Sequence, residues 1–378
     1  MLDSRLYWIW LQQALGYGSG YLTALLRAFS SPEEMYEADS HMLRECGMTG
    51  TVLSRLCDKS IDTARAILDT TLQHGDWLLT PADAAYPSLL RGIYAPPAVL
   101  YGRGEIPDFS CAPAVAVVGT RSLSRYGSDV TVTMVSGLVR GGALIVSGGA
   151  EGGDAVATAA ALECGGRVVT VQACGLDVNY PAANEPLRRR TLAQGGTLLS
   201  EYPYGVKVNK GAFHVRNRLM SGMAHGVLVT EAPEGSGTLI TARFAREQGR
   251  DVFAVPGALN MPHSVGGNVL IQSGAKLVRS ADEILEEYVP LFPQLAKREE
   301  VPKAEKKVSA KKPDKAAPPA PVSEAAAAVL RLLSAEAQPV DEIAAQAALP
   351  MPQVLAALTE LEMFGLAVSE AGQQYRRV

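Results

Sequence analysis

The sequence has few cysteines, and none of them forms a pattern that binds zinc or builds a disulfide framework. The five cysteines are an odd number, they are widely spaced, and no Cys-x-x-Cys pair occurs. Disulfide scaffolds and structural zinc sites both need paired, closely spaced cysteines. We therefore expect reduced thiols and no metal site.

Long apolar runs are also missing. No run approaches the roughly 18–20 residues that a membrane-spanning helix needs. The first residues, 1–5, include an acid and lead to no small-residue cleavage site of a secretory signal. We expect a cytoplasmic protein with no membrane partner.

An excess of positive charge is the third absence. The chain has 378 residues, with 35 Lys and Arg against 39 Asp and Glu, a net charge of −4. Averaged over the surface, this charge would argue against nucleic acid as a partner. However, residues 188–218 carry seven cations and one acid, a net +6, whereas residues 323–378 carry three cations and seven acids, a net −4. A basic DNA-binding segment is therefore compatible with the overall charge.

Residues 1–75 are predicted to form short helices of a helix-hairpin-helix or SAM-like domain. Apolar residues recur there at helical spacing, and the glycine turns at 15–20 and 46–50 each open a new helix. Such a turn presents backbone N–H groups that suit a DNA phosphate. Many helical scaffolds use the same turns with no ligand, so both interpretations stay open.

Residues 76–295 are predicted to form an α/β domain. Short β-branched runs alternate with helix-length segments, and the expected strands are 115–118, 143–146, 168–171, 197–199, 227–229 and 252–255. Near-continuous apolar strands of this kind indicate a doubly wound parallel sheet with helices on both faces. Ligands of such sheets bind at the carboxyl ends of the strands, so we expect the site there.

Two further parts complete the chain. Residues 296–322 are rich in lysine and proline, a composition that cannot build a core, and are predicted to be a flexible linker. Residues 323–378 contain three helical stretches followed by a short hairpin around Gly372, the pattern of a winged-helix domain.

Two loops at strand ends carry groups that could hold a phosphate. In the first, Gly119 allows a close approach, Thr120 can bond a phosphate oxygen, and Arg121 offers a bidentate guanidinium. The second, residues 147–154, starts with Ser147 and Gly148 and resembles a phosphate loop without the spacing of G-x-G-x-x-G. Nothing matches the P-loop of ATPases, which excludes ATP hydrolysis by that motif.

The third and fourth loops strengthen the case for nucleic acid. Residues 207–218 hold four cations and one aromatic, Phe213, with no acid. Single-stranded nucleic acid uses this combination, phosphates on cations and a base on a ring; the alternative places Phe213 in the core and the cations on a solvated face. The loop at 231–238 opens a helix and can cradle an anion at its start.

Several short motifs occur in order along this region and together resemble one family. They are Gly119-Thr120-Arg121, Gly175-Leu176-Asp177 with Tyr180-Pro181 and Asn184, Arg216-Asn217-Arg218, Gly237-Thr238-Leu239-Ile240-Thr241-Ala242, Val255-Pro256-Gly257, and Gly267-Asn268 before Gly274-Ala275. They are similar to those of the DNA-processing protein A (DprA/Smf) family of bacterial recombination mediators. The resemblance covers most of residues 80–280, and the flanking helical and winged-helix parts fit it.

The resemblance implies an extended Rossmann-like domain that binds single-stranded DNA, forms a homodimer, and protects and delivers the DNA to the RecA recombinase during natural transformation. It implies no catalytic residue and no cofactor. The DNA-site residues that it implies are Gly119, Thr120, Arg121, Ser147, Gly148, Lys210, Phe213, Arg216, Asn217, Arg218, Gly237 and Asn268. Among them, we expect Arg121 and Lys210 to hold phosphates, Phe213 to stack on a base, and Asn217, Gly237 and Asn268 to shape the loops. Because phosphate contacts and stacking do not read the edges of bases, we expect the site to have only a weak base preference.

The chain departs from the family pattern at three positions. Gly153 and Thr158 replace the usual Ile and His of the second loop and its helix, and His214 replaces a proline after the pocket Phe. The first two alter the geometry of that loop. His214, close in sequence to two arginines, would make DNA binding pH-sensitive if it is exposed; the alternative is a neutral, hydrogen-bonded ring.

Two other functions compete with this interpretation. Phosphoribohydrolases share this type of sheet and carry a Gly-Gly-x-Gly-Thr-x-x-Glu loop, but residues 239–241 supply no carboxylate after Thr238. Glu201 and Glu231 lie at strand ends and could act as bases, although no partner group is evident. The winged helix suggests a DNA-binding regulator, but its net −4 opposes contact with phosphates and favours a docking role toward protein.

Overall fold

A computed structural model of the chain describes residues 3–297, 323–334, 337–370 and 374–377. The chain divides into two compact units, Met1–Glu299 and Glu300–Val378, which are described separately below. The predicted linker at 296–322 lies almost wholly outside the described residues. Within the described segments, no helix combines the length and the apolar character that crossing a bilayer requires.

The first unit begins with six short helices. Asp3 caps the first by accepting a hydrogen bond from the backbone N of Arg5 at 3.0 Å. The two glycine turns join α1 to α2 and α4 to α5, as the spacing predicted. The helices are α1 (Ser4–Leu15), α2 (Tyr21–Ala28), α3 (Pro32–Glu37), α4 (Ser40–Glu45), α5 (Gly50–Cys57) and α6 (Asp62–Gln73).

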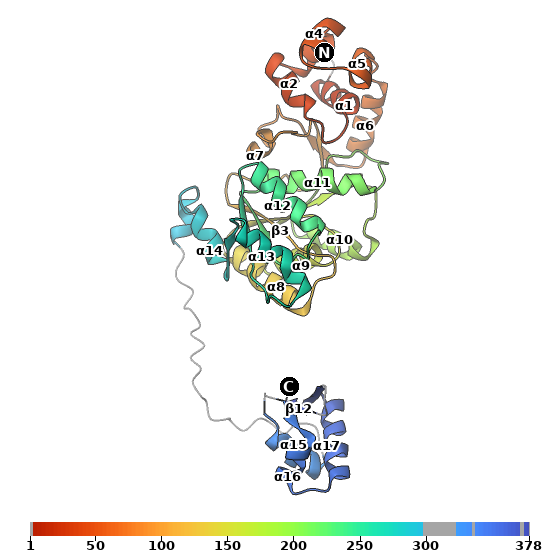
Figure 1. Cartoon of the computed structure of the whole chain (residues 1–378). Coiled ribbons are helices and arrows are strands. Elements are labelled where there is room, and N and C mark those ends of the chain that lie inside the picture. Colours follow the sequence, from red (N-terminus) through yellow and green to blue (C-terminus); the bar gives the residue numbers. More distant parts are fainter. Residues whose placement is uncertain (1–2, 298–322, 335–336, 371–373, 378) are drawn as a thin grey trace. The chain divides into compact units, whose positions relative to one another are not determined.

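These six helices share their core with one edge of the sheet that follows. Apolar side chains of α1 pack in the same cluster as Val99, Tyr101 and Leu198. Gln12 of α1 joins the two layers, because its Nε2 donates to the Val99 carbonyl at 2.9 Å and its Oε1 accepts from the Tyr101 hydroxyl at 3.2 Å. The helical group therefore covers the end of the sheet that is uppermost in Figure 1.

The centre of the unit is one nine-stranded sheet with the strand order β1-β2-β6-β5-β4-β3-β7-β8-β9. From β6 to β9 in this order every neighbouring pair is parallel, whereas β1 and β2 are antiparallel to their neighbours. The strands are β1 (Trp77–Leu79), β2 (Leu100–Gly104), β3 (Ala114–Val118), β4 (Leu144–Ser147), β5 (Val168–Gln172), β6 (Thr197–Ser200), β7 (Gly226–Val229), β8 (Asp251–Ala254) and β9 (Lys276–Leu277).

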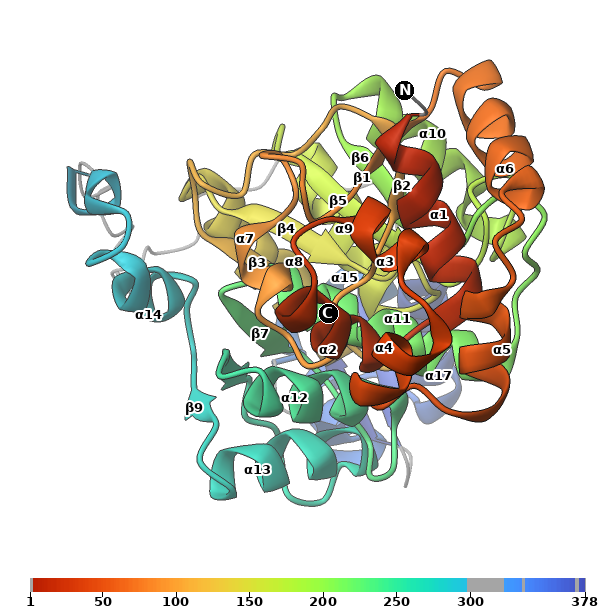
Figure 2. The same ribbon diagram turned by 90° about the horizontal axis from the view of Figure 1, so that it is seen from above.

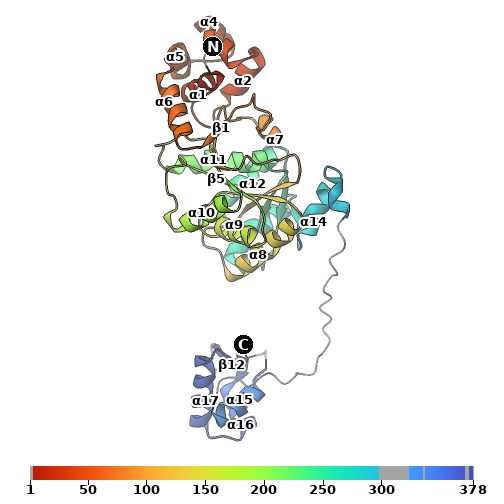
Figure 3. The same ribbon diagram turned by 180° about the vertical axis from the view of Figure 1, so that it is seen from behind.

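Helices cover both faces of this sheet. Longer helices alternate with the strands, and α12 and α13 lie side by side in Figure 2, whereas α8, α9 and α10 lie together in Figure 3. The helices are α7 (Ser88–Arg91), α8 (Arg125–Arg140), α9 (Gly153–Glu163), α10 (Glu185–Ala193), α11 (Lys210–Met223), α12 (Gly237–Glu247), α13 (Val265–Gln272) and α14 (Asp282–Leu285), with short 3-10 turns at Ala182–Asn184, Pro262–Ser264, Glu286–Tyr288 and Pro293–Lys297.

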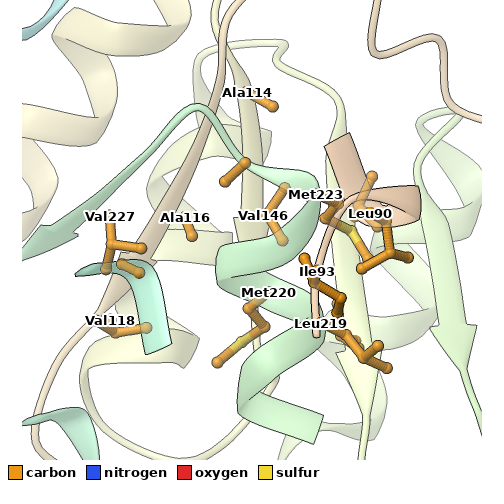
Figure 4. Packing of buried hydrophobic residues seen from close by; sticks show 14 of the residues in the cluster. Leu90, Ile93, Ala114, Ala116, Val118, Val146, Leu219, Met220, Met223 and Val227 are labelled. Atoms are coloured by element: carbon orange, nitrogen blue, oxygen red, sulfur yellow. The ribbon is translucent and has the colours of Figure 1, made fainter. Parts of the chain in front are cut away.

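The central strand β3 shows why its sequence is apolar throughout. Ala116 and Val118 face α11 and α12, where they pack with Met220 (Figure 4). Val115 and Val117 point to the opposite face, into the cluster that includes side chains of α8 and α9. Both faces of the strand are therefore buried, and alternation of polar and apolar residues is absent, as expected for a parallel sheet between two helical layers.

The predicted fold class is confirmed, with one addition. All six predicted strands are present, with bounds shifted by a residue or two at most. The antiparallel strands β1 and β2 and the parallel edge strand β9 were not predicted. β1 and β9 are only three and two residues long, and β2 contains Arg103 between two glycines, so none of them has the longer apolar run that marks the predicted strands.

The second unit is a winged-helix fold, as predicted. Ser323 caps its first helix by accepting from the backbone N of Ala326, and its hydroxyl donates to Glu360 at 2.6 Å. A small sheet in the order β10-β12-β11 completes the fold. Its elements are α15 (Glu324–Leu332), β10 (Gln338–Pro339), α16 (Val340–Ala347), α17 (Met351–Met363), β11 (Ala367–Glu370) and β12 (Gln374–Arg377).

Candidate nucleic-acid interface

The candidate site lies where the winding direction of the sheet reverses. From β3 the chain builds outward through β4, β5 and β6 on one side, and β7 and β8 then extend the other side. The loops after β3 and β7 therefore diverge at the carboxyl edge of the sheet and leave a crevice. In open α/β sheets this is where ligands bind.

Two glycines hold the walls of this crevice close together. A side-chain carbon placed on Gly153 would lie 2.5 Å from the Cα of Gly119, so neither position accepts a larger residue without movement. The Gly153 N–H, at the start of α9, donates to the Thr120 carbonyl at 3.0 Å, and the Thr120 N–H donates to the Glu231 carbonyl at 2.9 Å. The loop after β3 is thereby fixed to both neighbouring loops.

Helix α11 brings the third loop to the same place. It begins at Lys210 because the Asn209 side chain caps it, accepting from the Ala212 N–H at 2.9 Å. The helix connects β6 to β7 and packs on the sheet with its later turns buried. Its first turn leaves Lys210 exposed, and the next turns direct Phe213 and Arg216 toward the loop after β3.

A cavity of about 330 Å³ occupies the crevice. Its size is at the lower end of the range for small-ligand pockets, which is roughly 300–1,000 Å³. Of the predicted site residues, Gly119, Thr120, Arg121, Phe213, Arg216, Asn217 and Gly237 line it. The remaining lining residues are Val118, Ala150, Asp154, Met220, Ser236, Thr238 and Thr241.

The mouth of the cavity carries a cation on an aromatic ring. The guanidinium carbon of Arg121 lies 4.9 Å from the centre of the Phe213 ring, within the range of a cation–π contact. Tyr180 approaches the same ring, with 5.7 Å between ring centres. Arg121 is exposed and makes no hydrogen bond or ion pair with the other described residues, so its donors are available to a ligand.

The floor of the cavity holds a buried carboxylate and a buried guanidinium. Asp154 and Arg216 are 5% and 4% exposed. Burial raises the pKa of Asp154, while the charge of Arg216 and backbone N–H groups oppose that rise. Burial likewise lowers the pKa of Arg216, against the effect of Asp154. The charge on each group therefore stabilises the charged form of the other, although no ion pair joins the two.

Asn217 and Arg216 tie α11 to its surroundings. Arg216 donates from Nη1 to the Val171 carbonyl at 2.7 Å and from Nε to the Asn217 side-chain oxygen at 3.1 Å. The Asn217 Nδ2 in turn donates to the Gly237 carbonyl at 3.4 Å, at the start of α12. These bonds hold the third and fourth loops together across the cavity.

The other predicted site residues lie outside the cavity lining. Ser147 is buried and its hydroxyl donates to the Val117 carbonyl at 3.2 Å. Gly148 lies beneath Arg216, where a side-chain carbon would be 2.0 Å from Nη1. The Asn268 side chain donates to the Gly257 carbonyl at 2.9 Å and accepts from its N–H at 3.2 Å, which closes the loop after β8.

Arg218 is buried in an internal ion pair. Its Nη2 donates to both carboxylate oxygens of Glu201, at 2.6 and 2.7 Å, and the two side chains are 6% and 3% exposed. The backbone N–H of Gly18, in the turn between α1 and α2, also donates to Glu201, at 3.4 Å. The first glycine turn therefore faces a carboxylate of the same chain.

The second strand-end carboxylate is engaged as well. Glu231 accepts hydrogen bonds from the N–H and the hydroxyl of Ser124, at 2.8 and 2.5 Å, at the start of α8. His263 approaches it at 3.8 Å. Across the residues that the structure describes, no three His, Cys, Asp or Glu side chains come together as metal ligands do.

The basic segment at 188–218 does not form one continuous exposed surface. Arg188 donates to the carbonyls of Tyr180 and Pro181, and Arg216 and Arg218 are buried. His214 is exposed, and its ring meets that of Phe244 on α12, with 5.0 Å between centres. The exposed cations next to the cavity mouth are thus fewer than the charge of the segment suggested.

Sequence reasoning missed part of the cavity lining. Asp154, Ser236, Thr238 and Thr241 were not among the predicted site residues. A signal for Asp154 was available, because it follows the Gly152–Gly153 pair at the end of a strand and starts a helix that points at the crevice. Nothing in the spacing of Thr241, one turn into α12, distinguishes it from a core threonine.

Comparison with known proteins identifies the family. The sequence model of the DNA recombination-mediator protein A family matches residues 77–289, and that of the DprA winged helix domain matches residues 313–373. Protein Smf of Synechocystis is 33% identical over 399 residues, covering 99% of both chains. DNA processing protein DprA of Bacillus subtilis is 44% identical over 202 residues, covering 53% of this chain and 68% of the relative.

Two solved structures are similar to this one. DNA processing protein A from Streptococcus pneumoniae, 35% identical, superposes with a TM-score of 0.64 and covers 75% of this chain and 97% of its own. The protein from Helicobacter pylori, 30% identical, gives a TM-score of 0.51 and covers 57% of this chain and 96% of its own. Sequence, fold and domain order agree, and the chain belongs to the DNA recombination-mediator protein A (DprA/Smf) family.

Proposed function

We propose that this chain binds single-stranded DNA at the crevice between β3 and β7 and delivers it to a RecA-type recombinase. The observation that carries the proposal is the pairing of exposed Arg121 with the Phe213 ring at the mouth of the cavity. A cation and a ring side by side hold a phosphate and a base of one nucleotide. The similar protein from H. pylori is itself described by its single-stranded DNA binding mode.

In this proposal the predicted residues divide into those that contact DNA and those that support the site. Arg121 and Lys210 hold phosphates: Arg121 is exposed and lines the cavity, and Lys210 is exposed at the start of the helix that carries Phe213. Phe213 stacks on a base. Asn217 and Asn268 hold loops in place through the hydrogen bonds described above. Gly119 and Gly237 leave space for the strand. Ser147 and Gly148 support the floor, and Arg218 stabilises α11 from within.

We also propose that the first unit forms a homodimer. Four apolar side chains near the carboxyl edge of β8 and along α13 and β9 are exposed by 41–91%. They are Leu259, Met261, Val269 and Leu277. Apolar side chains gathered on one side of a domain are a common basis for self-association. A dimer would place two DNA crevices on one particle and allow a strand to bind both.

The competing enzyme interpretation lacks a free general base. Both strand-end carboxylates are engaged, Glu201 by Arg218 and Glu231 by Ser124. Asp154, the carboxylate that lines the cavity, is buried and accepts a hydrogen bond from the Ala150 N–H at 3.3 Å. We therefore propose binding rather than turnover; incubation with nucleoside monophosphates tests it, and stoichiometric release of free base would contradict it.

One experiment tests the main proposal directly. Fluorescence anisotropy of labelled single- and double-stranded DNA across a salt series should show tighter binding to the single strand. The affinity should fall steeply as salt rises, because the cations of the protein displace counterions from the phosphates. RecA should then form filaments faster on DNA already coated with this protein than on bare DNA. Equal binding of single and double strands, or no effect on RecA, would contradict the corresponding part of the proposal.

A further inference from the structure

The floor of the cavity holds two charged groups that face the same space. Asp154 lies in the first turn of α9 and Arg216 in the middle of α11, and both are more than nine-tenths buried. They flank Gly148: a side-chain carbon placed there would lie 2.0 Å from Arg216 Nη1 and 2.5 Å from Asp154 Oδ2. Gly148 therefore leaves the gap in which these groups come close together.

The two groups retain unused hydrogen-bonding capacity. No ion pair joins them. Arg216 donates to the Val171 carbonyl and to the Asn217 side chain, and Asp154 accepts from the Ala150 N–H, at 3.3 Å, and from the Gly148 N–H. The Arg216 Nη2 has no hydrogen-bond partner among the described residues. Ser236 Oγ, also at the cavity, is buried without a partner. A buried hydroxyl normally has a hydrogen-bond partner, so the unpaired Ser236 Oγ points to a ligand in the cavity that supplies one.

The chemistry of the floor selects one kind of base. A carboxylate accepts two hydrogen bonds side by side, and a guanidinium beside it donates to an acceptor. A base that bridges both groups therefore needs an acceptor next to two donors on a single edge. Guanine has that edge, with O6 beside N1–H and N2–H, whereas each of the other bases has a single donor group and lacks this order.

We propose that the cavity holds a guanine base of the bound strand, with Arg216 donating to O6 and Asp154 accepting from N1–H and N2–H. The ring of Phe213 lies on the cavity wall, where it can stack on the same nucleotide. This inference rests on the proposed binding of single-stranded DNA and adds a base preference to it. Cations and a ring alone would give weak preference, as the sequence suggested, but the buried carboxylate adds a group that reads a base edge.

The test uses the full chain and oligonucleotides of thymine in which every third base is guanine, adenine, cytosine or inosine. Isolated guanines avoid quadruplex formation. We expect the guanine strand to bind roughly three- to tenfold more tightly than the all-thymine strand. The gain is below that of a full base contact, because the strand can also bind with a thymine in the cavity. Inosine, which lacks the N2 amino group, should lose most of that gain. Equal affinities for all strands would overturn the proposal.

Matched variants assign the preference to Asp154. Asp154→Asn should reduce the ratio of guanine-strand to all-thymine affinity, and Glu151→Gln, the same charge change at an exposed position in the same loop, should leave that ratio intact. An equal effect of both would indicate general electrostatics and overturn the assignment. If Asp154→Asn fails to fold, the guanine–inosine comparison on the unaltered chain still decides. Absence of binding to any strand would contradict the proposed function itself, whereas binding without guanine preference would contradict this inference alone.

Discussion

The guanidinium of Arg121 lies over the ring of Phe213, with 4.9 Å between its central carbon and the ring centre, although the two residues lie far apart in the sequence. One follows β3 and the other lies in the second turn of α11. Their contact places an exposed cation and a partly exposed ring at the mouth of one cavity. The predictions below follow from this pair and from the groups that hold it in position.

Replacing Arg121 should weaken the binding of single-stranded DNA without changing the fold. Loss of one phosphate contact costs about 1–3 kcal/mol and lowers the salt slope of the affinity by about one. Anisotropy titrations of Arg121→Ala at several salt concentrations measure both. Arg140→Ala is the matched control. Arg140 is exposed in the last turn of α8, far from the loop that precedes this helix and carries Arg121, so this variant should bind DNA as the unaltered chain does. Unchanged affinity in Arg121→Ala would mean that the site lies elsewhere.

Phe213 should contribute through stacking rather than charge. Phe213→Ala should lose roughly 1–3 kcal/mol of affinity with the salt slope nearly unchanged, because no cation is removed. Phe213→Trp should restore most of the affinity, since a larger ring also stacks. Equal losses in the Ala and Trp variants would indicate that the ring packs in the core and serves no base.

Arg218 should matter for stability and little for DNA. Glu201→Gln leaves a buried guanidinium without its carboxylate, which costs about 3–5 kcal/mol of unfolding free energy in comparable pairs. The double variant Arg218→Met with Glu201→Leu should recover much of that loss, because neither charge remains buried. Denaturant unfolding measures the stability, and titration of the folded variants measures DNA binding. A stable Arg218→Met variant that no longer binds DNA would show that the arginine contacts the strand.

Removing the second unit should leave the DNA affinity of the first nearly intact. Residues 323–378 carry a net charge of −4, which disfavours contact with phosphates. A chain ending at Lys297 should bind single-stranded DNA within about threefold of the full chain. A large loss on this truncation would show that the winged helix contributes directly to DNA binding.

His225 should make the fold less stable in acid. Its Nδ1 accepts a hydrogen bond from the Ala114 N–H at 3.0 Å, and burial lowers the pKa of the ring from its usual value of 6.5. Because the unfolded chain takes up the proton first, stability is full above pH 6.5 and falls as the pH drops toward the lowered pKa. Thermal unfolding between pH 7.5 and 5 measures the slope. His225→Asn should flatten it, whereas His41→Gln, at an exposed histidine, is the control.

Much of the fold was predictable because the parallel strands are apolar on both faces. Val115–Val118 is a clear example, since every residue in it is buried. Strand β2 was not predictable in the same way, because Arg103 and two glycines interrupt it and its stability comes from α1 and from β6 beside it. Local patterns identify an element that buries itself, and they fail where a partner distant in sequence supplies the burial.

The candidate site was predictable in its loops and less so in its charges. Arg121 and Phe213 were identified together, and both line the cavity. Arg216 and Arg218 were grouped with them as DNA contacts, but Arg218 pairs with Glu201 in the interior. In sequence, a dense run of cations looks the same whether its members face solvent or a carboxylate seventeen residues away. The side of α11 on which each cation falls, and the position of β6 beside that helix, decide between these outcomes.

The hydrogen bonds of Gln12 to the Val99 carbonyl and the Tyr101 hydroxyl bear on how this protein can be dissected. A fragment that starts at residue 76 would keep every strand of the sheet, but it would expose the apolar face that α1 covers and leave buried polar groups of β2 unpaired. Such a fragment should aggregate when expressed. For binding experiments, crystallisation and imaging, the helices and the sheet should therefore be treated as one piece, with any shortening made at the other end.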